Sequence, residues 1–74
     1  MTPAPTTSAA LCRARNWQPG TTLTATIDGS TTTLLITAIG DIHVLARRTR
    51  IDHHDLADIE TIWDLRTRPW SAAT

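Results

Sequence analysis

Two glycine-containing turns divide the stretch from Trp17 to Arg50 into three runs rich in Thr, Ile, Leu and Val. The turns lie at 28–30 (Asp-Gly-Ser) and at 40–41 (Gly-Asp). Short β-branched runs separated by such turns are typical of antiparallel strands joined in a meander. The pattern limits the chain to the β-rich fold classes, and it predicts strands at roughly 21–28, 31–39 and 42–49.

The first predicted strand is half-buried. Its apolar residues Leu23, Ala25 and Ile27 alternate with threonines, so that they share one face of the sheet. A two-residue turn centred on 29–30 would place Leu23 opposite Ile36 in the second strand. This register stacks apolar side chains on apolar side chains.

The second and third strands carry apolar side chains on both faces. Leu35 and Ile39 fall on the face opposite to Ile36, and a two-residue turn at 40–41 would place Ile42 opposite Ile39. A three-stranded sheet with two apolar faces is not stable alone in water. It must curl into a barrel, be covered by the C-terminal segment, or bind a partner.

The C-terminal third fits two interpretations. We expect a loop or a single helical turn at 52–58, followed by a fourth strand at roughly 59–67, in which apolar and polar residues largely alternate. The alternative is a helix, because Leu56, Ile59 and Trp63 also lie at helical spacing.

Together these patterns predict an all-β domain over residues 17–70. It is a small antiparallel barrel or a strongly bent meander of four to five short strands, with a single helical turn as an option near 52–58. Residues 1–16 lack apolar periodicity, so we expect a flexible N-terminal arm there, and residues 71–74 should form a C-terminal tail.

Tryptophan must supply all the large aromatic area of the core. The 74-residue chain, short enough for one domain, has Trp17, Trp63 and Trp70 but no Phe or Tyr. A chain of this size buries little surface, so every large apolar side chain matters. We expect at least two of the tryptophans to cover the ends of the core.

No arrangement of side chains in the sequence indicates catalysis or cofactor binding. His53 and His54 are adjacent, and neighbouring side chains on an extended segment point apart, which disfavours a shared metal ion. Ser30 lies in a turn and Ser71 near the end of the chain, and neither is paired with a base in a recognisable motif. We therefore predict a non-enzymatic protein with no metal, no cofactor and no small-molecule substrate.

Composition also sets expectations about location and partners. The single cysteine, Cys12, allows no disulfide within the chain and fits a reducing, cytoplasmic setting. No apolar run approaches the roughly 20 residues that span a bilayer, so no membrane association is expected. Seven basic and seven acidic residues cancel, so the chain lacks the overall positive field that attracts nucleic acid non-specifically.

Five arginines and two tryptophans form the candidate partner-binding surface. If the third and fourth strands lie close together, one edge of the domain gathers these side chains: Arg47, Arg48, Arg50, Trp63, Arg66, Arg68 and Trp70. Arg and Trp dominate the energetics of protein interfaces, and the same pair of residue types suits single-stranded nucleic acid. A third interpretation is that the acids between 52 and 64 neutralise these arginines.

The turn and strand pattern resembles that of small barrels of the Src-homology-3 type. The resemblance covers 17–70 and rests on P-G-T-x-L-x-A-x-I-D-G at 19–29, L-x-I-T-A-I-G-D at 34–41 and V-L-A-R-R at 44–48. The pattern is similar in particular to short accessory proteins encoded by bacteriophages of GC-rich hosts. The aromatic groove of the peptide-binding members is missing, and the resemblance assigns no functional residue.

Two functional hypotheses follow. The first is a small interaction module that binds a protein partner or assembles with itself, because two apolar sheet faces need covering. The alternative is a nucleic-acid-binding barrel that uses the Arg-rich edge.

Overall fold

The computed structural model describes residues 5–73, which form one helix and six strands. In chain order these are α1 (Ser8–Arg15), β1 (Thr22–Ile27), β2 (Ser30–Ile39), β3 (Val44–Ile51), β4 (His54–Asp55), β5 (Thr61–Trp63) and β6 (Ser71–Ala72). The strands pair antiparallel in the order β4-β3-β2-β1-β6, and β5 pairs with another part of β3.

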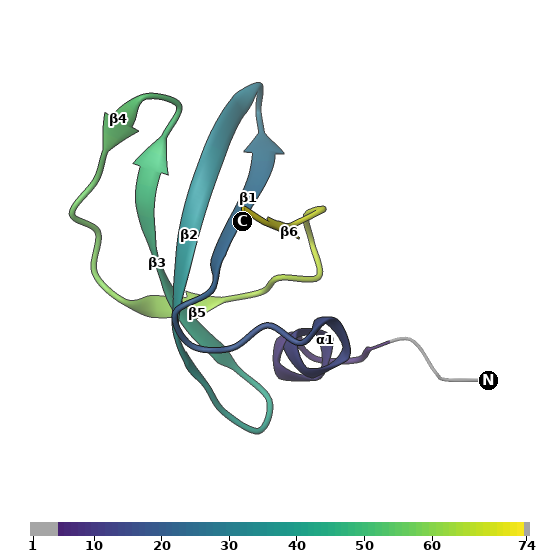
Figure 1. The fold of residues 1–74 in the computed structure, drawn as a ribbon. Coiled ribbons are helices and arrows are strands. Elements are labelled where there is room, and N and C mark those ends of the chain that lie inside the picture. Colours follow the sequence, from purple (N-terminus) through teal and green to yellow (C-terminus); the bar gives the residue numbers. More distant parts are fainter. Residues whose placement is uncertain (1–4, 74) are drawn as a thin grey trace.

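The predicted all-β class is confirmed, in the form of a strongly bent meander. Figure 1 shows a curved sheet with β5 crossing its lower end and α1 close by. The sheet stays open, because β4 and β6 form its two opposite edges and do not meet. The described residues form six strands, more than the four to five expected, because β4 and β6, each two residues long, add to the longer strands.

The β1–β2 hairpin has a different turn from the one predicted. Asp28 and Gly29 are the central residues, with φ of 52° and 84°. Two successive positive φ values define the turn whose twist matches antiparallel strands. Leu23 consequently pairs with Leu34 and not with Ile36. The predicted register was wrong by two residues, a shift that keeps each side chain on the predicted face.

The β2–β3 connection is longer than the predicted two-residue turn. Ile39 pairs with Val44, so the loop spans 40–43, and the Gly40 N–H donates to the His43 carbonyl at 2.9 Å. The predicted pairing of Ile39 with Ile42 was therefore wrong. A bulge at Thr37 also moves Ile39 to the core face, where it packs against the core.

Residues 52–73, the described part of the C-terminal third, contain no helix. The chain reverses at 52–53, where Asp52 has a positive φ of 53°, and β4 then pairs with the end of β3. This pairing is incompatible with the helical turn proposed near 52–58. The predicted strand at 59–67 is present only as β5, because the chain turns again over 65–69.

The predicted flexible arm was wrong for residues 8–15, which form α1. The Thr7 hydroxyl accepts a bond from the Ala10 N–H at its start, and Asn16 ends the helix in the left-handed conformation. Ala9 and Cys12 are fully buried. These two small side chains carry the buried face of a two-turn helix, and so the sequence shows no strong apolar period. The first residues of the predicted arm, 1–4, lie outside the described part of the chain.

The core lies between the sheet, α1 and the C-terminal turns. Leu23, Leu34, Ile36 and Val44 from the sheet are fully buried, and Leu65 joins them from the turn after β5. Trp17 and Trp70 are 8% and 4% exposed, which confirms that two tryptophans cover the core. The predicted tail also takes part, because β6 pairs with Leu23 and Thr24 of β1, and the Ala73 N–H donates to the Thr22 carbonyl. Residue 74 lies outside the described range.

Candidate functional site

The candidate arginines of β3 lie on two different faces of the sheet. Residues paired across strands share a face. Arg48 pairs with fully buried Leu34 and so lies on the core face. Arg47 pairs with Leu35 on the outer face. A bulge at Thr49 places Arg50 on the outer face as well, opposite Thr33. The predicted single Arg-rich edge is therefore divided.

Three of the five candidate arginines form ion pairs with acids of the segment 52–64. The ion pairs are Arg48–Asp58, Arg50–Asp55 and Arg66–Asp64. All of these side chains are at least a third exposed, so the pairs contribute little to stability. Their effect is to lower the net positive charge of the surface. Within residues 5–73, Arg47 and Arg68 form no ion pair.

Trp63 and Trp70 pack against each other next to the core. Their ring centroids lie 6.1 Å apart with an interplanar angle of 87°, an edge-to-face arrangement that is favourable for aromatic pairs. The indole Nε1–H groups of both residues are buried and find no acceptor among the described residues. Buried donors are normally satisfied, so these two donors are a distinctive property of the site.

Two grooves lie beside this tryptophan pair, and Arg68 lines both of them. The first, here the sheet groove, measures about 480 Å³ and lies on the open part of the core face. Its walls combine apolar side chains with two guanidinium groups and a few hydroxyls. It is lined by Ile27, Ser30, Thr32, Arg48, Ile51, Trp63, Thr67 and Arg68.

The second, here the helix groove, measures about 230 Å³ and lies between α1 and the turns that precede β6. It has an apolar floor with three guanidinium groups around it, and no acidic residue lines it. The lining residues are Pro5, Leu11, Arg15, Trp17, Leu65, Arg66, Arg68, Pro69 and Trp70. The Arg15 guanidinium also stacks over the Trp17 ring at 5.8 Å.

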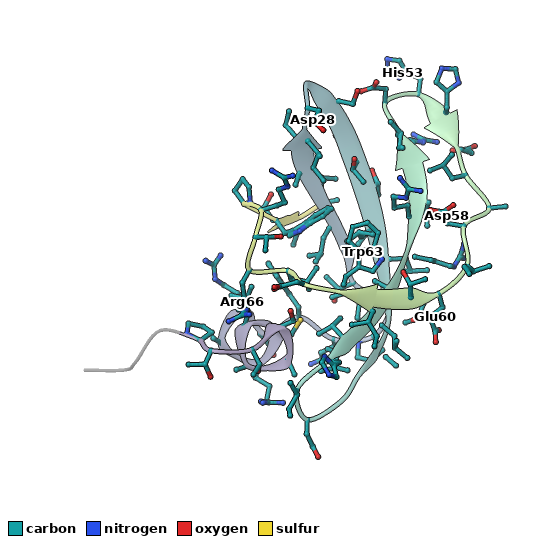
Figure 2. The ribbon with its side chains drawn as sticks, turned by 180° about the vertical axis from the view of Figure 1, so that it is seen from behind. Asp28, His53, Asp58, Glu60, Trp63 and Arg66 are labelled. Carbon is teal, nitrogen blue, oxygen red and sulfur yellow. The ribbon has the colours of Figure 1, made fainter. Side chains whose placement is uncertain are left out.

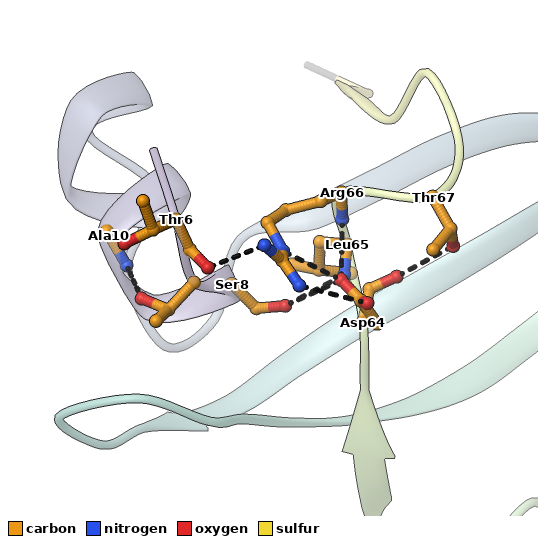
Figure 3. Close-up of polar contacts among 8 residues, drawn as sticks. Thr6, Ser8, Ala10, Asp64, Leu65, Arg66 and Thr67 are labelled. Atoms are coloured by element: carbon orange, nitrogen blue, oxygen red, sulfur yellow. Dashed lines mark hydrogen bonds and ion pairs between the residues drawn. The ribbon is translucent and has the colours of Figure 1, made fainter. Parts of the chain in front are cut away.

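A polar network fixes the turn between the grooves to α1 (Figure 3). The Ser8 hydroxyl accepts from the buried Leu65 N–H at 3.0 Å and donates to Asp64 at 3.3 Å. The Arg66 backbone N–H and guanidinium both donate to Asp64, and these bonds hold the pKa of Asp64 below its usual value. Arg66 also donates to the Thr6 carbonyl. Arg66 is therefore a bracing residue more than a free ligand-binding group.

The structure brings together five of the seven candidate residues. Arg48, Trp63, Arg66, Arg68 and Trp70 line one groove or the other, while Arg47 and Arg50 lie on the outer face. Sequence reasoning missed Arg15 and Trp17 as groove residues. The Arg13–Arg15 cluster was visible in the sequence, but its position depends on α1, which the sequence pattern did not indicate.

The other polar groups give no further site. Burial raises the pKa of the Cys12 thiol, which disfavours the thiolate that a nucleophile requires. No group of three or more His, Cys, Asp or Glu side chains suited to a metal ion occurs among residues 5–73. Within the same range, no helix is long and apolar enough to cross a membrane.

Comparison with known families gives one match. Residues 6–74 match a family described as a domain of unknown function, DUF7241. The chain belongs to the DUF7241 family. The match covers α1 together with all six strands of the described residues, so the family domain includes the helix and both grooves. No curated protein and no solved structure matches the chain.

Proposed function

We propose that the chain is a non-enzymatic interaction module of the cytoplasm that binds a protein through the two grooves sharing Arg68. The observation that carries the proposal is that Arg68 lines both grooves and that each groove includes one ring of the Trp63–Trp70 pair. Buried tryptophan beside an exposed arginine is the composition of an interface hot spot. The sequence resembles accessory barrels encoded by phages, and we propose that this module is an accessory protein of that kind.

The polar groups around Arg68 are suited to binding a polypeptide. Arg68 offers a guanidinium without an ion-pair partner in the described chain, and the Nε1–H groups of Trp63 and Trp70 are unsatisfied donors. Carbonyl and carboxylate oxygens of a bound segment would accept from the Arg68 guanidinium, whose side chain is exposed. The sheet groove adds the apolar side chains of Ile27 and Ile51, which can bury a partner's apolar residue.

The alternative, nucleic-acid binding, draws on the helix groove, where three guanidinium groups surround two tryptophans. A phosphate-binding surface needs several cations along one track. Here the ion pairs of Arg48, Arg50 and Arg66 remove three of them, and Arg47 and Arg68 lie on different faces. These observations favour protein as the partner.

A capture experiment with two matched arginine variants tests the proposal. The tagged chain is expressed in the cell that encodes it and isolated with and without nuclease treatment, alongside Arg68→Ala and Arg47→Ala. We expect the wild type and Arg47→Ala to retain the same defined protein despite nuclease, and Arg68→Ala to lose it. Loss of all bound material after nuclease, or full retention by Arg68→Ala, would contradict the proposal.

A further inference from the structure

The chain between β4 and β5 presents an exposed apolar side chain between two carboxylates. Residues 57–60, here the acidic loop, have the sequence Ala-Asp-Ile-Glu and no regular secondary structure. Ile59 is 78% exposed, more than the exposed isoleucines Ile42 and Ile62, at 56% and 61%. Asp58 is paired with Arg48, whereas Glu60 is exposed and forms no ion pair within residues 5–73. Contact with a partner would remove the apolar surface of Ile59 from water, which is favourable.

The helix groove is complementary to this loop in both polarity and charge. Leu11, Trp17 and Leu65 give it an apolar floor. Of the arginines that line it, Arg66 is paired with Asp64, whereas Arg15 and Arg68 form no ion pair within residues 5–73. A cavity of roughly 150 Å³ holds a benzene molecule, so a groove of about 230 Å³ has room for one isoleucine side chain.

The loop and the groove lie on opposite sides of one molecule. In Figure 2, Asp58 and Glu60 lie at one side of the sheet, and Arg66, which lines the helix groove, lies at the other. Figure 1 likewise shows the segment between β4 and β5 away from α1. The acidic loop therefore cannot fill the groove of its own chain, but it can fill that of another copy.

We propose that the acidic loop of one copy binds the helix groove of a second copy, with Ile59 on the apolar floor and Glu60 beside Arg15 and Arg68. This inference rests on the proposed function, and it names a second copy of the chain as a partner. The contact joins two different surfaces, so it is a head-to-tail contact, and repetition produces a ring or an open filament. One short loop buries less than the 1,200–2,000 Å² that is roughly usual for a stable interface, so the association should be weak and concentration-dependent.

Two single variants separate the two halves of the contact. Ile59→Asp destroys the loop but keeps the groove, and Arg68→Glu reverses the groove's charge but keeps the loop. Both side chains are exposed, so thermal melts should stay close to that of the wild type. Ile42→Asp and Arg47→Glu are the matched controls, since they make the same changes at an exposed isoleucine and an outer-face arginine.

Sedimentation velocity from low micromolar to near-millimolar concentration gives the readout. We expect the wild type and both controls to form species larger than a dimer as concentration rises, and the two variants to remain monomeric when alone. An equimolar mixture of Ile59→Asp and Arg68→Glu should form a 1:1 complex and nothing larger, because it restores one loop–groove contact per pair. Added salt should weaken all of these associations.

A wild type that stays monomeric throughout would overturn the inference. So would assembly in either variant alone, or a mixture of the two that stays monomeric. Such a result would leave the proposed function standing if Arg68→Ala still lost a captured protein. Failure of both experiments would count against the grooves as a binding surface altogether.

Discussion

The β1–β2–β3 meander and the C-terminal third are held together by different kinds of contact. The meander has long registers, from Thr22–Leu35 to Ile27–Ser30 in the first hairpin and from Ile39–Val44 to Thr32–Ile51 in the second, which two bulges interrupt. In the described part of the C-terminal third, residues 52–73, the strands are β4, β5 and β6, of two or three residues each. Buried Leu65 and Trp70, together with the Ser8 hydroxyl, fix its position.

This difference assigns stability mainly to the meander and the positioning of binding side chains mainly to the C-terminal third. Backbone ladders hold the meander, whose fully buried side chains point inward, while Ile27 and Ile51 also line the sheet groove. The segment from 64 to 70 consists largely of turns. Binding residues concentrate in such loops when a rigid scaffold holds them in place. Both grooves include side chains from this segment, and it rests on α1. The helix is therefore the link between the two regions.

The largest expected effect comes from removing the helix. Deletion of 1–13 takes Ala9 and Cys12 out of the core, and we expect it to abolish cooperative unfolding, since small domains have only roughly 5–15 kcal/mol of stability. Ala9→Asp should act in the same direction by burying a charge. Arg13→Ala, an exposed change in the same helix, is the control. A sharp thermal melt of the truncated chain, followed by circular dichroism, would show that the C-terminal third does not depend on α1.

The next largest effect on stability is expected from a substitution within the meander. Ile36 is fully buried and pairs with Ala46, so Ile36→Ala should reduce the free energy of unfolding by about 2–4 kcal/mol. The neighbouring Leu35→Ala, on the half-exposed outer face, should cost clearly less. Urea titrations of the two variants make the comparison. Equal losses would mean that the outer face is covered in solution.

Ser8→Ala tests the joint between the two regions. It leaves the buried Leu65 N–H without its acceptor, and such a loss costs roughly 1–3 kcal/mol. Exposed Ser71→Ala should have no measurable effect. Amide exchange in the Ser8→Ala variant should speed up over 64–70 before it does so in β2. Uniform acceleration in both regions would show that they unfold as one unit.

Sequence alone predicted the meander because its signals are local. Glycine turns and β-branched alternation specify strands and faces without reference to distant residues, and the Leu23–Ile36 register error left every side chain on its predicted face. The turn types were harder to predict from the sequence. The predicted turn at 29–30 used Gly29 and Ser30, whereas Asp28 adopts the positive φ instead.

The site was only partly predictable because it depends on non-local contacts. Trp63, Arg68 and Trp70 were chosen by residue type, and the structure places all three in the grooves. The contribution of Arg15 and Trp17 required α1, whose buried side chains are small. Arg48 and Arg50 lie on different faces of the sheet because of a bulge that no pattern in the sequence predicted. The ion-pair interpretation, by contrast, was confirmed for Arg48, Arg50 and Arg66.

A smaller, pH-dependent effect should arise from Asp64. Its pKa is lowered from 3.8 in the folded chain, so its stabilising contribution is complete above that value and is lost as the pH falls through the folded pKa. Asp64→Asn should be less stable near neutral pH but should lose less stability on acidification below about pH 4. Asp41→Asn controls for the removal of one exposed carboxylate. Parallel melting temperatures of wild type and Asp64→Asn across this range would contradict the assignment.

Whether the grooves bind protein or nucleic acid is tested most directly by the anisotropy of a fluorescent random single-stranded oligonucleotide. It is titrated with the wild type and with the Arg15→Ala/Arg68→Ala double variant at low and moderate salt. The proposed protein partner predicts no micromolar binding at either salt, and no difference between the two proteins. Micromolar binding at low salt that weakens steeply with added salt, and that the double variant loses, would contradict the account.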